Sequence, residues 1–364
     1  MPRLAAAGTS EHNRAMLAAL TRLQALAVIA LFVVLALATL TIGASQSGEA
    51  ISGDGRYSDV QLYHDIGNAV AGREGYYHAA TRLQRAHGFP TSPFVTVRLP
   101  TLAWIEAALG WRTVHVLLCV LLAVTAAAWF AMLRPLVSGR ERMLAMLLVL
   151  VGGAMVASPG LSVSHELWAG VLVALAMALR VKGLTAPAFP TAAFLAAASA
   201  LAIRELALPF VLLAAFWAWR SGRYRELAAW AALIAGYALV LLLHRQAVVP
   251  LSLPGDALSQ GWDGLRGPGA VLQDIADVTL LHLIPAPFSY LAVLLCLLGF
   301  LGAPPPLARF ALPWLATIAL LLAVFARPVN FYWAILSVPT VMAGLAFLPR
   351  TLRDLIRAAS SSRT

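Results

Sequence analysis

The sequence predicts an all-α, polytopic membrane protein with about ten transmembrane helices. Two observations lead to this fold class. Of the 364 residues, 61% are hydrophobic and only 12% are charged, which is about half the charged fraction of a soluble domain. The apolar residues also form long uncharged blocks, as a hydrocarbon core about 30 Å thick requires of the helices that span it. A water-soluble globular enzyme is therefore not expected.

About ten apolar blocks account for the predicted helices. Their number is open by one or two, because Pro159, Pro209, Pro285 and Pro287 interrupt several blocks. The first block is taken as a helix, since its uncharged stretch is longer than the core of a signal peptide. The blocks lie at about 24–44, 114–133, 143–158, 165–179, 187–203, 206–219, 227–243, 285–302, 310–326 and 330–348.

The arginine-rich links predict that both termini are cytoplasmic. Most of the positive residues fall in alternate short links, and such residues favour the cytoplasmic side. Since the position of these arginines is explained by membrane topology, nucleic acid is not an expected partner. The predicted organisation is a cytoplasmic segment at 1–23, an integral membrane domain at 24–348 and a basic cytoplasmic tail at 349–364. Two outer segments, at about 45–113 and 244–284, are long enough to be functional and to contain interfacial helices.

The first outer segment carries carboxylates among tyrosines. Asp54 and Asp59 stand near its start, and a helix is predicted from Asp59 to a terminating Gly72. Tyr63 then lies one turn after Asp59 on the same face. Asp59 has two interpretations, because a carboxylate at a helix N-terminus can cap the helix or can act as a general base toward a nearby hydroxyl. Asp54, which is nearer to the first membrane helix, is an alternative base.

Charged pairs are predicted at the outer ends of membrane helices. His165 and Glu166 begin one helix, and Arg204 and Glu205 separate two apolar runs. Charges at a membrane edge are costly and point to function, so we expect these four side chains to line a substrate pocket. The alternative is that they pair with one another and only stabilise helix packing.

A further arginine marks the outer turn before the last helix. Arg327 opposes the bias of positive residues toward the cytoplasm, and its planar guanidinium matches phosphate oxygens. We expect Arg327 and Arg204 to contact a lipid phosphate, with Asn330 and Tyr332 in the same pocket. For Tyr332 and Trp333, membership of an interfacial aromatic belt is the simpler interpretation.

The second outer segment predicts an interfacial helix. Asp274, Asp277 and Leu281 fit one face of it, and we expect these carboxylates to be solvated. No P-loop, nucleophile elbow, zinc-protease motif or dinucleotide fingerprint is found, so no site for a nucleotide sugar is visible. No metal or other cofactor is expected.

The order of these features resembles the GT-C superfamily of membrane glycosyltransferases, and most closely its bacterial polyprenol-phosphate-mannose-dependent members. In that family a large outer segment follows the first helix and contains D-x-x-x-Y, then G-x-x-x-Y and an R-x-P. Many relatives have a second acidic residue where this chain has Val60, so the resemblance does not extend to a divalent metal. The matching residues are Asp59, Tyr63, Gly72, Tyr76, Arg98 and Pro100.

The resemblance implies sugar transfer on the outer face of a bacterial inner (plasma) membrane. The donor would be a sugar on a polyprenyl phosphate, the acceptor a lipid or glycan, and the anomeric configuration would invert. Asp59 would be the base, and Tyr63 would contact the sugar or support Asp59. The remaining pocket residues implied are Arg98, His165 and Glu166, and membrane lipid surrounds the protein as a further partner.

Two other classes of function stay open. A transporter or lipid flippase is the main alternative, because membrane charges also mark substrate paths. An acyltransferase centred on His165 would need a second catalytic partner beside that histidine. The identity of the sugar, the acceptor, the prenyl chain length and the oligomeric state are not specified by the sequence.

Overall fold

A computed structural model describes residues 17, 20–42, 57–183, 189–261 and 264–361. Within these ranges the chain is helical and has no β-strand, and its one strand-like feature is an isolated bridge between Ser92 and Leu258. The predicted all-helical class is therefore confirmed. Asp54 and most of the predicted segment 1–23 lie outside the described residues.

The predicted number of about ten membrane spans is wrong. Four helices in the described part of the chain are long and apolar enough to cross a membrane, or up to five if one bent pair forms a single span. The four are Arg22–Thr41, Trp111–Leu133, Tyr224–Leu251 and Pro305–Phe325, and the bent pair is Pro328–Ser337 with Val341–Ser360.

The other apolar blocks do form helices, but these helices are short or charged. Helices α10 (Thr191–Ile203) and α11 (Leu208–Arg220) have 13 residues each, so each rises about 20 Å, which is less than the hydrocarbon thickness. Helix α9 (His165–Lys182) has 18 residues but includes Glu166, Arg180 and Lys182. The apolar composition of the sequence correctly indicated that these helices exist, but it did not indicate how long each helix is. The remaining short helices are α8 (Gly139–Gly152) and α14 (Phe288–Gly299).

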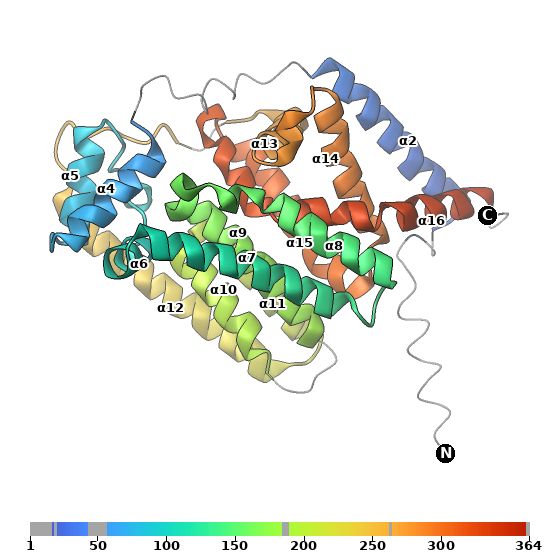
Figure 1. The fold of residues 1–364 in the computed structure, drawn as a ribbon, viewed down its shortest axis with the longest axis horizontal. Coiled ribbons are helices and arrows are strands. Elements are labelled where there is room, and N and C mark those ends of the chain that lie inside the picture. Colours follow the sequence, from blue (N-terminus) through green and yellow to red (C-terminus); the bar gives the residue numbers. More distant parts are fainter. Residues whose placement is uncertain (1–16, 18–19, 43–56, 184–188, 262–263, 362–364) are drawn as a thin grey trace.

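Helix α9 lies at the centre of the bundle, between α7 (Trp111–Leu133) and α10 (Figure 1). Nearly all of its side chains are buried. Gly170 lets the 3-10 segment η12 (Pro328–Ser337) pack directly on α9, since a Cβ atom at this position would lie 2.8 Å from the carbonyl oxygen of Ile335. The N-terminus of α9 is thereby held near the turn that carries Arg327.

Three short helices of the segment 45–113, which was predicted to lie outside, form a cap at one end of the bundle (Figure 1). They are α4 (Asp59–Ala71), α5 (Tyr76–Ala86) and α6 (Thr101–Leu109). A small apolar cluster that includes Leu62, Ile66 and Tyr76 holds the cap together, and Val248 at the end of α12 (Tyr224–Val248) joins it to the bundle.

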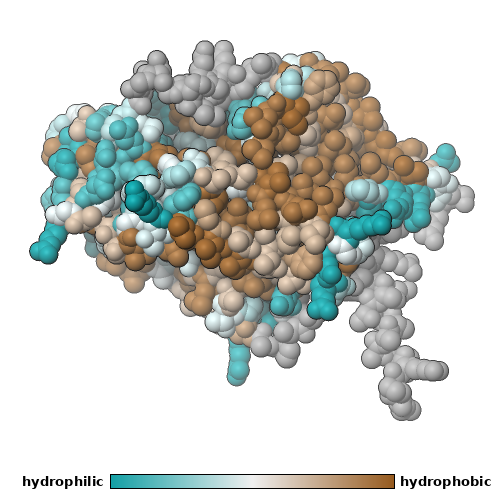
Figure 2. Space-filling model, viewed as in Figure 1, coloured by the Kyte–Doolittle hydropathy of each residue, from teal (hydrophilic) through white to brown (hydrophobic). Residues whose placement is uncertain are grey.

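The surface divides into apolar and polar zones. Figure 2 shows apolar side chains over α2 (Arg22–Ala38), α14 and α8, between hydrophilic side chains at the α4–α5 cap and at α16 (Leu348–Ser360). This distribution matches a protein whose middle faces hydrocarbon. The tail at 349–364 was predicted only as a basic segment, but its α16 portion is a helix that packs on α2 and α14.

The second outer segment differs from its prediction. Its helix α13 (Gly267–Asp277) ends before Leu281, which lies in a separate 3-10 turn. Asp274 is fully buried and accepts two hydrogen bonds from Arg266, at 2.7 and 2.9 Å. The expectation of a solvated Asp274 is therefore wrong, because an arginine eight residues earlier turns back to neutralise it.

Candidate functional site

A cavity of about 300 Å³ lies where the cap meets the bundle. Five parts of the chain that are distant in sequence line it: the start of α4, the segment from Gln84 in α5 to Arg98, the turn after α10, the loop at Ser259, and the turn at Arg327. Eight of the predicted site residues take part. They are Asp59, Tyr63, Arg98, Arg204, Glu205, Arg327, Asn330 and Tyr332.

Helix α4 brings Asp59 and Tyr63 to the cavity wall. The N-cap of α4 is Ser58, whose hydroxyl accepts a hydrogen bond from the Gln61 amide at 3.2 Å. Asp59 is therefore the first residue inside the helix, and its interpretation as the cap is wrong. The helix ends at Ala71, next to Gly72, as predicted, but Gly72 is the C-cap with φ −75° and is not a left-handed C′ glycine; the left-handed residue is Arg73, with φ 71°.

The Asp59 carboxyl has a raised pKa. Burial is the main cause, because it disfavours the charged form. The neighbouring Arg98 and Arg204 guanidinium groups oppose this effect, while the Glu166 carboxylate adds to it. A carboxyl of this kind is a stronger proton acceptor, once ionised, than a solvent-exposed aspartate.

Arg98 connects α4 to the bundle. Its Nε atom donates to the Tyr63 hydroxyl at 3.2 Å, and its two terminal nitrogens lie 3.9 Å from Glu166 and 3.6 Å from Glu205. The Tyr76 hydroxyl donates to the Arg98 carbonyl oxygen at 2.6 Å, which fixes the backbone from which this side chain extends. Arg98 is therefore held in place from both ends.

Arg204 lines the cavity although its side chain is only 1% exposed. Its Nε atom is 2.8 Å from the Glu166 carboxylate, and it also forms an ion pair with Glu205. Arg204 and Glu205 thus pair with each other, as one interpretation of the sequence expected, and both also line the cavity; their contact with a substrate stays a prediction.

His165 and Glu166 were predicted to line the pocket, but they lie behind its wall. Both are 4% exposed. Glu166 acts through its ion pairs with Arg98 and Arg204, and the His165 ring meets the Tyr63 ring edge-on, with centroids 4.6 Å apart. These two residues therefore support the side chains that face the cavity.

Arg327 carries the cavity's uncompensated charge. Its guanidinium donates to the side-chain oxygen of Gln260, a neutral group. In the described part of the chain no carboxylate lies within 4.0 Å of it, whereas Arg98 and Arg204 both have carboxylate partners. Beside it, Asn330 donates to the Tyr332 hydroxyl at 3.3 Å. Trp333 is buried, so it is no part of an aromatic belt.

Sequence reasoning missed three polar residues of the cavity wall: Gln84, Thr96 and Ser259. Gln84 had a detectable signal, because it follows Tyr76 and Ala80 at helical spacing on the buried stripe of α5. Ser259 had none, since it reaches the cavity only because its backbone amide donates to the Ser92 carbonyl, at 2.8 Å.

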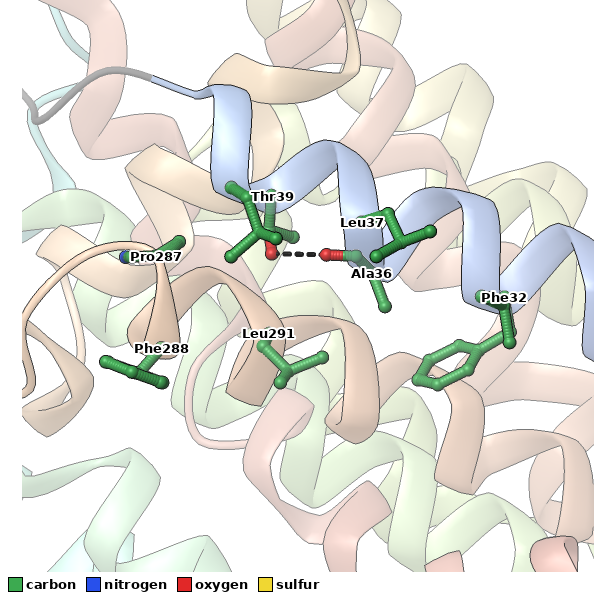
Figure 3. A pocket seen from close by; sticks show the side chains of 9 residues that line it. Phe32, Ala36, Leu37, Thr39, Pro287, Phe288 and Leu291 are labelled. Carbon is green, nitrogen blue, oxygen red and sulfur yellow. Dashed lines mark hydrogen bonds between the residues drawn. The ribbon is translucent and has the colours of Figure 1, made fainter.

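A second cavity, of about 280 Å³, lies between α2 and the start of α14 (Figure 3). Side chains such as Phe32, Leu37 and Leu291 line it, and its one hydroxyl, that of Thr39, donates to the Ala36 carbonyl oxygen at 2.6 Å. This groove suits hydrocarbon and offers no group for chemistry. Of these two cavities, only the first is lined by charged side chains.

The described residues hold no group of three or more His, Cys, Asp or Glu side chains placed to bind a metal ion. The chain matches no protein-family profile, no curated protein and no solved structure. Function must therefore be argued from the cavity.

Proposed function

We propose that this protein is a membrane glycosyltransferase, which moves a sugar from a polyprenyl-phosphate donor to an extracytoplasmic lipid or glycan acceptor with inversion. One observation carries the proposal: Asp59, a half-buried carboxylate, and Arg327, a guanidinium with no carboxylate partner among the described residues, line the same cavity. Sugar transfer from a lipid phosphate needs both groups, one to accept a proton and one to stabilise the phosphate that leaves.

In the proposed reaction Asp59 takes the proton of an acceptor hydroxyl. The acceptor oxygen then bonds to the anomeric carbon, and the bond from that carbon to the phosphate oxygen breaks. The electron pair leaves with the phosphate, whose growing negative charge Arg327 stabilises. Arg98 and Arg204 contribute less net charge, because Glu166 and Glu205 already neutralise them.

The surroundings of the cavity support a lipid-linked donor. Residues of the α4–α6 cap and of the bundle both line the cavity, and Figure 2 shows hydrophilic side chains over the cap and apolar ones over the bundle. A headgroup and a hydrocarbon chain would each find suitable surroundings near this junction. The position proposed for the protein is the bacterial inner membrane, with both termini cytoplasmic and the α4–α6 cap outside, in line with the arginine distribution.

A transfer assay tests the proposal. Purified protein in lipid nanodiscs would receive radiolabelled polyprenyl-phosphate sugars together with an extract of envelope acceptors. We expect Asp59→Asn to lower turnover by about 100-fold or more, the scale of general base catalysis. Asp54→Asn belongs in the same series as the alternative base. Glu74→Gln is the matched control, because Glu74 pairs with Arg82 on the cap and does not line the cavity.

The assay also separates the alternatives. Full turnover by Asp59→Asn, in a protein that keeps its fold, overturns the role of Asp59. If the wild type consumes no donor with any extract, yet moves labelled sugar lipid across a sealed vesicle, the transporter class replaces the enzyme.

A further inference from the structure

The orientation of the Gln84 side chain is fixed by its own hydrogen bonds. Gln84 is 5% exposed, and its amide nitrogen donates to the carbonyl oxygens of Pro90 and Thr96, at 3.3 and 3.2 Å. Only the nitrogen end of an amide can donate, so the two carbonyls determine which end is which. The Gln84 oxygen therefore lies on the opposite side, away from both.

Two polar oxygens on this wall lack a partner among the described residues: an amide oxygen, which only accepts, and a hydroxyl, which can accept or donate. The Oε1 atom of Gln84 and the Oγ1 atom of Thr96 are both buried without a hydrogen bond in the described structure. Both residues line the cavity, as Asp59 does. Buried polar atoms are usually paired in folded proteins. Other buried atoms of the described residues also lack a hydrogen bond, but these two oxygens lie on contacting residues of one cavity wall, where a bound hydrogen-bond donor would complete them.

The chemistry of these atoms selects the group. An amide oxygen only accepts hydrogen bonds, and a phosphodiester has no proton to donate at neutral pH. The phosphate therefore belongs with Arg327, and the Gln84 oxygen needs a hydroxyl. Phe89 and Pro90 line the same cavity and offer apolar surface for the carbon side of a sugar ring. A few placed polar groups among apolar ones are typical of a ligand site.

From this arrangement we infer that Gln84 and Thr96 form a hydroxyl-binding wall, which holds a hexose ring beside Asp59. The inference rests on the proposed function and deepens it, since it names the residues that recognise the sugar. The hexose is either that of the lipid donor or that of a glycan acceptor, because both present the same hydroxyls.

The test measures binding, so that it does not depend on turnover. In the first arm the full-length protein in nanodiscs binds farnesyl phosphate, and separately its mannosyl and glucosyl phosphodiesters. In the second arm, protein filled with a non-transferable phosphonate analogue of the donor binds methyl mannoside or methyl glucoside. The variants are Gln84→Leu and Thr96→Val, and the control is Gln61→Leu, an exposed glutamine on α4.

We expect the hexose to strengthen binding in one arm, and each variant to reduce that gain by about 5- to 10-fold, as for one lost hydrogen bond. Farnesyl phosphate should bind all proteins equally, which shows that the fold is kept. Loss in the first arm assigns the wall to the donor sugar, and loss in the second arm assigns it to the acceptor. Gln61→Leu should behave as the wild type.

Other results overturn the inference. One is a wild type that binds farnesyl phosphate but gains nothing from a hexose in either arm. Another is Thr96→Val with an unchanged hexose gain, because this variant removes only a hydroxyl that has no partner in the described structure. The proposed function can fail separately: hexose binding that needs Gln84, in a protein that shows no transfer, keeps the wall and rejects the enzyme.

Discussion

The Nε atom of Arg204 lies 2.8 Å from the Oε1 atom of Glu166, and both side chains are almost completely buried. Glu166 comes from the first turn of α9, and Arg204 is the C-cap residue of α10. The pair thus joins two helices at the cavity wall. Because Glu166 also lies 3.9 Å from Arg98, one buried carboxylate holds both cations in position.

Glu166→Gln should destabilise the protein markedly. Removing one partner of a buried ion pair leaves a poorly compensated charge, which lowers the free energy of unfolding by about 3–5 kcal/mol. Because Arg204 still pairs with Glu205 in the variant, we expect a loss near the lower end of this range. Unfolding in mixed micelles, followed by tryptophan fluorescence, measures the change. The comparison is Glu141→Gln, which breaks a partly exposed pair with Arg350 and should cost about 1 kcal/mol or less. An equal loss of unfolding free energy in both variants would show that the buried pair stabilises the protein no more than the partly exposed one.

The pH dependence of transfer should reflect the raised pKa of Asp59. Only the ionised carboxylate accepts a proton, so kcat/KM falls as pH drops through this pKa, and it does so at a higher pH than for an ordinary aspartate near 4. Glu166→Gln removes a charge that raises this pKa, so the acidic limb should move to lower pH. Arg98→Gln should move it to higher pH. If the acidic limb of the pH profile stays at the same pH in both variants, it reflects the titration of a group other than Asp59.

Arg327→Gln should weaken donor binding by about 10- to 100-fold, the range expected when a charged hydrogen bond to phosphate is lost. Gln260→Ala is an informative companion variant, because the Gln260 side-chain oxygen accepts a hydrogen bond from the Arg327 guanidinium in the described structure. Freeing that guanidinium should leave donor affinity unchanged or improve it. Affinity for farnesyl phosphate in nanodiscs measures both effects, and a loss in Gln260→Ala would indicate that Gln260 itself contacts the donor.

Sequence reasoning placed the cavity residues well because topology brings them together. Asp59, Arg204 and Arg327 all follow or precede apolar blocks on one predicted side, and they line one cavity. The number of spans could not be read in the same way. An apolar block specifies burial, but burial inside a protein and burial in lipid have the same composition, so short buried helices such as α10 resemble spans.

Contacts between distant segments were also beyond the sequence. The burial of Asp274 depends on Arg266, and the position of Ser259 depends on pairing with Ser92. Neither pairing has a periodic signature. Gln84 is the intermediate case, because helical spacing places it on the buried stripe of α5, while its free oxygen follows only from the carbonyls that its amide meets.

The contact of α4 with α6 should weaken as pH rises. His64 lies 2.6 Å from the buried Glu106, and this hydrogen bond raises the pKa of His64 above its ordinary value near 6.5. Because folded His64 holds its proton more tightly than the unfolded chain, the contribution of the pair is fully present below about pH 6.5 and is lost as pH rises through the raised pKa. The protection factor of the α4 amides, which is the intrinsic exchange rate at each pH divided by the observed rate, should therefore fall across that window, and His64→Gln should abolish that fall.

Gly67→Ala tests the same contact between α4 and α6 by adding a methyl group to the interface. A Cβ atom at Gly67 would lie 2.3 Å from the Glu106 carboxylate, so Glu106 must move away from His64 or α4 must shift from α6. Overpacking of this kind costs about 1–3 kcal/mol. Gly236→Ala is the control, because Gly236 lies within α12 with nothing within 4 Å of its Cβ position, and it should stabilise the protein by about 0.5–1 kcal/mol. If Glu106 is the group displaced, Gly67→Ala also reduces the pH dependence of the protection factor in α4. A destabilised variant that keeps the full pH dependence would mean that the helix shifts while the His64–Glu106 pair survives.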